Sequence, residues 1–123
     1  MSDGLILIVD DNEPTRALMS TVLTSVGYDT IQAIDGGSAI KVIQEHPVAC
    51  AIVDQYMEPM GGFDMAKKMQ DNNIAAPPMV LVTAHETTDL LTKGTELGFR
   101  QILQKPVEPN RLVMTVERML KIK

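Results

Sequence analysis

The fold can be deduced from the segment Ala51-Ile52-Val53-Asp54-Gln55-Tyr56-Met57-Glu58-Pro59-Met60-Gly61-Gly62 in the middle of the chain. An apolar run over residues 48–53 stops at a carboxylate, Asp54, and a loop rich in proline and glycine follows. A short, continuous apolar run of this kind is typical of a strand that is buried on both faces of a parallel sheet. Asp54 would then lie at the carboxyl end of that strand, which is the edge where open α/β sheets bind their ligands.

A second apolar run near the start of the chain ends in the same way. Residues 5–9 read Leu-Ile-Leu-Ile-Val, and the pair Asp10 and Asp11 follows directly. If the two strands are neighbours in a parallel sheet, their carboxyl ends meet at one edge. The sequence therefore predicts three carboxylates close together at that edge.

The rest of the chain alternates between strand and helix patterns. Strands are predicted at residues 5–9, 28–33, 48–53, 79–82 and 102–103, of which 28–33 alternates weakly and is assigned to a sheet edge. Helices are predicted from the capping residues 11–14 to Gly27, from the cap Asp35 to Pro47, over residues 63–70 and 86–97, and from Pro109 to about residue 120. The helix at 86–97 has the poorest apolar periodicity, with Gly94 expected to be exposed, and is predicted to be the least rigid.

Five strands that alternate with five helices predict an α/β fold, a doubly wound parallel sheet with right-handed crossovers. At 123 residues the chain is expected to form one domain, spanning residues 1–123. The sequence contains no internal repeat, linker or low-complexity segment that would divide it.

Charge and composition limit the possible partners. The net charge is −5, and the 11 basic residues are scattered along the sequence, which disfavours direct binding to nucleic acid. The chain has no signal peptide and no apolar run near the length of a membrane span, so no membrane association is expected. Its single cysteine, Cys50, falls inside a buried run and indicates a reducing, cytoplasmic environment.

The predicted strand ends carry a chemically coherent set of side chains, namely Asp10, Asp11, Asp54, Thr83 and Lys105. Three carboxylates in one place repel one another unless they take up protons or bind a cation. Hard oxygen ligands without histidine or a cysteine pair favour Mg²⁺. With Asp54 as nucleophile and Lys105 and Thr83 holding phosphoryl oxygens, the set is suited to phosphoryl transfer.

On these motifs the whole chain resembles the receiver domain of two-component response regulators, including the single-domain chemotaxis regulators. The resemblance implies a flavodoxin-like fold with strand order 2-1-3-4-5. It implies that Asp54 is the phospho-acceptor, and that Asp11, Asp54 and the backbone carbonyl of Tyr56 bind Mg²⁺ with help from Asp10. It further implies that Thr83 and Lys105 contact the phosphoryl group and that the peptide before Pro106 is cis.

The same resemblance implies a signalling switch that catalyses only its own phosphorylation and dephosphorylation. The phosphoryl group would come from a sensor histidine kinase or a histidine phosphotransfer protein. The signal would pass through helix 4, strand 5 and helix 5 to a downstream protein or an attached output domain. Whether the receiver stands alone or comes from a larger protein stays open.

Two positions depart from the pattern of the family. Glu58 stands where the family usually has proline, with Pro59 one place late, and Ile102 stands where it usually has an aromatic residue. These departures keep open a receiver-like binding module that works without phosphorylation. A phosphate-handling enzyme or a flavin carrier on the same fold is a third possibility. Asp-Asp-Asn-Glu after the first strand would repel the phosphate of a flavin carrier, and a phosphatase with an aspartyl nucleophile would normally place that residue on the first strand, whereas the candidate here is Asp54.

Overall fold

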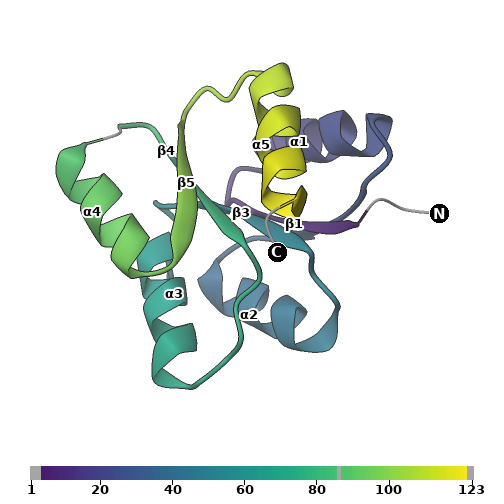
Figure 1. Ribbon diagram of the computed structural model, residues 1–123. Helices are drawn as coiled ribbons and strands as arrows, with labels where there is room; N and C mark the ends of the chain where they lie inside the picture. Colours follow the sequence, from purple (N-terminus) through teal and green to yellow (C-terminus); the bar gives the residue numbers. More distant parts are fainter. Residues whose placement is uncertain (1–3, 86, 122–123) are drawn as a thin grey trace.

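The computed structural model describes residues 4–85 and 87–121, which form a five-stranded parallel sheet with helices on both faces (Figure 1). The strand order is β2-β1-β3-β4-β5, as the resemblance implied. All four strand pairs are parallel, and β2 and β5 are the two edges. The strands are β1 (Leu5–Val9), β2 (Asp29–Ala33), β3 (Cys50–Asp54), β4 (Met79–Thr83) and β5 (Phe99–Gln104).

Five helices connect the strands, and together they cover the sheet. They are α1 (Glu13–Ser25), α2 (Gly36–Glu45), α3 (Gly62–Asp71), α4 (Thr88–Glu96) and α5 (Pro109–Lys121). Helices α1 and α5 lie together on one face, while α2 and α3 lie on the other (Figure 1). In the part of the chain that the structure describes, none of these helices has the length and apolar character needed to cross a membrane.

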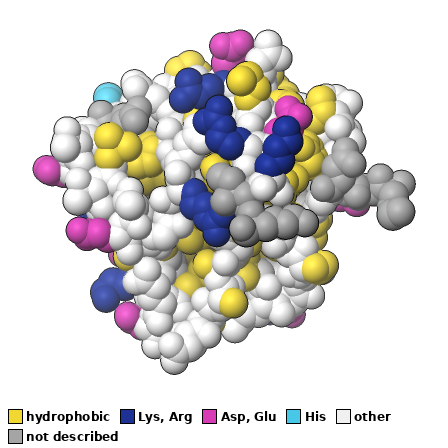
Figure 2. Space-filling model, viewed as in Figure 1, with side chains coloured by type: hydrophobic (Ala, Val, Ile, Leu, Met, Phe, Trp, Pro, Cys, Tyr) yellow, Lys and Arg dark blue, Asp and Glu magenta, His cyan; other side chains and the backbone are white. Residues whose placement is uncertain are grey.

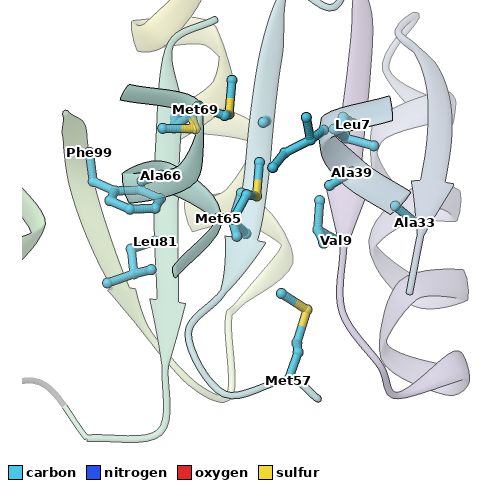
Figure 3. Close-up of a cluster of buried hydrophobic side chains, with 14 of the residues drawn as sticks. Leu7, Val9, Ala33, Ala39, Met57, Met65, Ala66, Met69, Leu81 and Phe99 are labelled. Atoms are coloured by element: carbon cyan, nitrogen blue, oxygen red, sulfur yellow. The ribbon is translucent and has the colours of Figure 1, made fainter. Parts of the chain in front are cut away.

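The three central strands are buried because both faces of the sheet are covered. One cluster of apolar side chains fills the space under α2, α3 and α4, and Figure 3 shows Met65, Met69, Leu81 and Phe99 among its members. A second cluster joins the opposite face of the sheet to α1 and α5. Cys50 lies in this second cluster, where burial raises the pKa of its thiol to about 12 and makes it unreactive.

Local signals explain where the helices begin. The side chain of Asn12 accepts a hydrogen bond from the backbone of Thr15 at the start of α1, and a proline occupies the first turn. Asp35 and Ser38 form a reciprocal capping box at the start of α2. The predictions that residues 11–14 and Asp35 begin helices are thus confirmed.

The region after β4 differs most from the sequence prediction. Strand β5 begins at Phe99 and not at Ile102, because it continues pairing with β4 beyond an irregularity near Met79 and Val80. Helix α4 begins at Thr88, since the Thr87 side chain caps it by accepting from the Leu90 backbone. Residue 86, where the helix was predicted to begin, lies outside the described residues.

The prediction that Gly94 is exposed was wrong, because this residue is buried against β5. A Cβ atom at Gly94 would lie 3.4 Å from Cδ1 of Ile102 and 3.7 Å from the Phe63 ring. The missing side chain therefore lets α4 approach β5 and α3 closely. Met57, in the loop after β3, is also buried, and its side chain belongs to the cluster beneath that loop (Figure 3).

Candidate functional site

The three predicted carboxylates meet at one edge of the sheet. Strands β1 and β3 pair in register from Ile6 and Cys50 to Val9 and Val53, so Asp10 follows one strand while Asp54 ends the other. Asp10, Asp11 and Asp54 each offer a carboxylate oxygen, and these oxygens lie within 4.8 Å of one another. Asp10 and Asp54 are buried, whereas Asp11 is exposed.

Lys105 joins two of these acids across the sheet. Its Nζ lies 3.0 Å from Oδ2 of Asp10 and 3.2 Å from Oδ2 of Asp54. The backbone supports this position, because the N–H of Lys105 donates to the carbonyl of Thr83 at the end of β4 over 2.7 Å. The structure thus places the predicted cation directly beside the predicted nucleophile.

Every polar group of Asp10 takes part in a hydrogen bond or an ion pair. Its N–H donates to the Ala33 carbonyl at 3.2 Å, and its Oδ1 accepts from the Asn12 backbone at 2.9 Å. Its carbonyl accepts from Arg16 at 2.8 Å, and the same guanidinium donates to Gln32 at 3.2 Å. Sequence reasoning missed Arg16 and Gln32. The available signal was the position of Arg16, a cation about one turn into the helix that follows the Asp10 and Asp11 pair.

A second missed residue, Gln55, shapes the loop that follows the nucleophile. Its side-chain oxygen accepts from the N–H of Phe63 at 3.0 Å, in the first turn of α3. Its carbonyl accepts from Gly62, and a Cβ atom at Gly61 would overlap that same carbonyl. The glycine pair therefore lets α3 begin directly behind Asp54. Within this loop the Glu58–Pro59 peptide is cis, as is Lys105–Pro106, the latter as the resemblance implied.

Thr83 lies at the carboxyl end of β4, next to β3, but its hydroxyl is engaged elsewhere. The side chain is fully buried, and Oγ1 lies 3.3 Å from both the backbone nitrogen and the carbonyl oxygen of His85. Through this contact Thr83 holds the first residues of the loop that leads to α4. The hydroxyl therefore contacts the backbone of the loop between β4 and α4.

The acids and Lys105 surround a hollow that opens to solvent and has a volume of about 320 Å³. Its lining is Asp10, Asp11, Asn12, Thr15, Asp54, Tyr56, Ala84 and Lys105. Tyr56, predicted to offer its carbonyl to a metal, thus lies at the same hollow, with its side chain exposed. Thr83 is absent from this lining, although its neighbour Ala84 belongs to it.

The electrostatics of the hollow disfavour an ionised Asp54. Burial raises the pKa of the Asp54 carboxyl above its ordinary value, and the negative charge of Asp10 raises it further. Lys105 acts in the opposite direction without cancelling these effects. Burial also works against the charge on Lys105, but its hydrogen bond to Asp10 and the charge of Asp54 outweigh that effect, so its pKa is raised. The site therefore has more negative charge than one ammonium group can balance.

The residues present are suited to a divalent metal. Three carboxylates with converging oxygens, two of them buried, form a hard, anionic donor set without nitrogen or sulfur ligands. Such donors favour Mg²⁺ over transition metals. The excess of negative charge around Asp54 is what a cation would neutralise.

Replacement of Asp54 by asparagine is expected to stabilise the metal-free protein at pH 7. Because the folded-state pKa of Asp54 is raised, folding stability declines as the pH rises above the ordinary carboxyl value of 3.8, where the unfolded chain loses its proton first. A neutral isostere removes this cost, so Asp54→Asn should gain about 1 kcal/mol in the free energy of unfolding. Urea unfolding at pH 7 and at pH 3 measures this, and the gain should disappear at pH 3. An equal gain at both pH values would contradict the electrostatic explanation.

Comparison with protein families connects this geometry to known proteins. The family model of the response regulator receiver domain matches residues 6–117, which includes every residue of the site. Sporulation initiation phosphotransferase F of Bacillus subtilis is 29% identical, and the match covers 100% of this chain and 98% of that protein. A probable transcriptional regulator, ycf27, of Porphyridium aerugineum is 30% identical over 98% of this chain.

Solved structures give the same result. The chemotaxis protein CheY4 of Vibrio cholerae superposes with a TM-score of 0.88 at 28% identity, covering 95% of this chain and 98% of that one. The signal receiver domain of a putative LuxO repressor from Vibrio parahaemolyticus superposes with a TM-score of 0.88 at 26% identity, covering 96% of this chain and 90% of that one. The chain spans about half the length of several curated relatives that it matches, the ycf27 regulator and the phosphate regulon regulator PhoB of Pseudomonas aeruginosa among them.

Proposed function

The chain belongs to the response regulator receiver family, whose members act in phosphorylation-based two-component signalling, and we propose from this premise that Asp54 is its phospho-acceptor. One observation carries the assignment. Asp54 ends the central strand β3, faces the acidic hollow and has the Lys105 ammonium 3.2 Å from its Oδ2. We further propose that residues 1–123 make up a single receiver domain.

The proposed reaction is an in-line displacement at phosphorus. A carboxylate oxygen of Asp54 attacks the phosphorus of the donor and forms an acyl phosphate. The bond from phosphorus to the donor atom breaks, and that atom leaves with the electron pair. In the reverse direction of the switch, water attacks the same phosphorus, the bond to Asp54 breaks, and inorganic phosphate departs from the restored carboxylate.

The predicted site residues have distinct parts in this reaction. Asp11, Asp54 and the Tyr56 carbonyl would hold Mg²⁺ with help from Asp10, and the bound ion would supply positive charge to the phosphoryl oxygens. Lys105 neutralises Asp54 before transfer and pairs with a phosphoryl oxygen afterwards. Thr83 would exchange its contact with His85 for a phosphoryl oxygen.

The direct test is a labelling experiment with acetyl phosphate. Incubation of the protein with Mg²⁺ and acetyl phosphate should add one phosphoryl group, visible by intact-mass spectrometry, and a metal chelator should prevent the addition. Absence of the adduct over a range of Mg²⁺ concentrations would favour the alternative of a receiver-like binding module that works without phosphorylation. In the cell, we propose a sensor histidine kinase or a histidine phosphotransfer protein as the donor.

We also propose that the signal leaves the site mainly through the loop after β4 and through α4. The Thr83 hydroxyl holds the backbone of His85, so a new bond to a phosphoryl oxygen would displace this loop. Ile102 packs against α4 at Gly94 and, being β-branched, is restricted at χ1. It can therefore follow the loop only in part and presents no ring to a partner. Helix α4 buries only Leu90 and Gly94 along its described length, so its displacement costs little.

Amide hydrogen exchange with and without the phosphoryl mimic beryllofluoride tests this route. The changes are expected to concentrate in residues 84–97 and to be lost in Thr83→Ala. Thr24→Ala is the matched control, since Thr24 is an exposed threonine on α1 whose hydroxyl donates to the carbonyls of Ser20 and Thr21 in the same helix. Changes that stay confined to β5 around Ile102, and that persist in Thr83→Ala, would reject the route.

A further inference from the structure

Two of the described cations differ from the rest in their exposure. Among the residues that the structure describes, every lysine and arginine is exposed except Lys105 and Arg16, which are partly buried. Figure 2 shows exposed cations as dark blue side chains on the outer surface, several of them over β5 and α5 in this view. The pairing of Lys105 with two acids of the hollow explains its burial. The ion pairs described for this chain do not include Arg16, so its burial on α1 has another cause.

The Arg16 guanidinium binds two neutral oxygen acceptors at the strand ends. Its Nη1 donates to the Asp10 carbonyl at 2.8 Å, and its Nε donates to Oε1 of Gln32, on β2, at 3.2 Å. Gln32 stands opposite Ile8 in the register of β1 and β2, so both acceptors lie near the carboxyl ends of these strands. A planar guanidinium holds two such acceptors in a fixed geometry that a lysine ammonium does not provide. Arg16 therefore fastens α1 to the ends of β1 and β2.

The Asp10 carbonyl belongs to the peptide unit that joins the neighbouring acids Asp10 and Asp11. Arg16 holds this unit at its oxygen. The next peptide unit is held as well, because the N–H of Asn12 donates to Oδ1 of Asp10 at 2.9 Å. Asp11 thus lies between two hydrogen-bonded peptide units, although its own side chain is exposed. The direction in which the Asp11 carboxylate leaves the backbone is therefore set in part by Arg16.

We propose that Arg16 is a positioning residue of the metal site, which orients the Asp11 carboxylate toward Mg²⁺ by holding the peptide between Asp10 and Asp11. The inference rests on the proposed function, in which Asp11 is a ligand of the ion. Groups that orient metal ligands without touching the metal commonly have a large effect on its affinity. The described hydrogen bonds of Arg16 go to a carbonyl and an amide oxygen, so this cation, unlike Lys105, does not occupy the carboxylate oxygens that a metal needs.

Two effects of Arg16 on Mg²⁺ binding have opposite signs. Its positive charge repels a second cation, so loss of the charge alone would tighten Mg²⁺ binding. Loss of the hydrogen bond to the Asp10 carbonyl would free the backbone before Asp11 and weaken Mg²⁺ binding. Because the guanidinium is partly exposed, water and salt screen its charge, and the positioning effect is expected to dominate. The sign of the change in affinity therefore distinguishes the two roles.

Mg²⁺ titrations followed by backbone amide shifts test this role. Arg16→Met keeps a long side chain of similar helix propensity but has no donor, and it should weaken Mg²⁺ binding about tenfold. Arg16→Lys restores the charge and one donor group, so its affinity should lie between those of Arg16→Met and the wild type. Gln32→Met removes only the second acceptor and should weaken binding about threefold. Arg118→Met is the matched control, because it makes the same change at an exposed arginine on α5, and it should leave binding unchanged.

Phosphorylation by acetyl phosphate separates positioning from a general loss of structure. In Arg16→Met the Mg²⁺ concentration for half-maximal phosphorylation should rise about tenfold. The rate at saturating Mg²⁺ should stay within about twofold of the wild type, because Asp54 and Lys105 are unchanged. A lower rate at saturating Mg²⁺ with an unchanged half-maximal concentration would show damage to the fold and would reject the positioning role.

Other outcomes would also overturn the proposal. Tighter Mg²⁺ binding in Arg16→Met would mean that Arg16 acts through its charge, and unchanged binding would remove its role. Equal changes in Arg16→Met and Arg118→Met would assign the effect to the net charge of the protein. A wild-type protein that forms the acyl phosphate while Arg16→Met keeps full Mg²⁺ affinity would reject the role of Arg16 alone. A wild-type protein that neither binds Mg²⁺ nor forms the adduct would reject the proposed function together with it.

Discussion

Asp54→Asn is expected to abolish phosphorylation completely. The amide is neutral and lacks the nucleophilic carboxylate oxygen, so no acyl phosphate can form at this position. The adduct of the wild-type protein should be stable in acid and labile in base, which distinguishes an acyl phosphate from a phosphoserine or a phosphothreonine. Intact mass after incubation with acetyl phosphate and Mg²⁺, followed by alkaline treatment, measures both properties.

Asp71→Asn is the matched control for this experiment. Asp71 is an exposed acid at the end of α3 that pairs with Lys67, so the same chemical change there should leave the full yield of adduct. Misfolding would not explain a loss in Asp54→Asn, because that variant is expected to be more stable than the wild type. A full yield of adduct on Asp54→Asn would show that the acceptor is a different residue.

The sequence was sufficient to predict the acidic cluster because its members follow directly from buried strands. An apolar run that stops at an acid can be recognised locally, and parallel pairing then brings the ends of β1 and β3 together. Asp10, Asp11 and Asp54 could thus be assigned to one site before any distance was known. Lys105 could be added because it directly follows the last strand, at the same edge of the sheet.

Other features of the site could not be predicted because they depend on contacts between distant segments. The Gln55 side chain accepts from the Phe63 backbone in the first turn of α3, and the Arg16 side chain donates to the Asp10 carbonyl. Both are polar residues in segments where polar residues are common. Gly94 was expected to be exposed, because the sequence around a glycine in a weakly periodic helix does not indicate which residues pack against it. Its burial is set by the approach of Ile102 and Phe63, which only the tertiary structure brings together.

Loss of the Asp11 carboxylate is expected to weaken Mg²⁺ binding by at least about tenfold. Asp10 and Asp54 each form an ion pair with Lys105 through Oδ2, whereas the described ion pairs of this lysine do not include Asp11. Asp11 is also the exposed member of the three, so it faces the side from which a hydrated ion arrives. Asp11→Asn should therefore require more Mg²⁺ for half-maximal phosphorylation while Asp54 remains available as the acceptor.

Lys105→Gln provides a control with the opposite sign. Because the ammonium group competes with a metal for the oxygens of Asp10 and Asp54, its removal should tighten Mg²⁺ binding. The same variant should slow phosphorylation, because the phosphoryl oxygen loses its cationic partner. Backbone amide shifts recorded during Mg²⁺ titration of the unphosphorylated proteins measure affinity apart from reactivity. Unchanged affinity in Asp11→Asn would exclude Asp11 as a ligand. Weaker affinity in Lys105→Gln would mean that the lysine organises the carboxylates for the metal and does not compete with it.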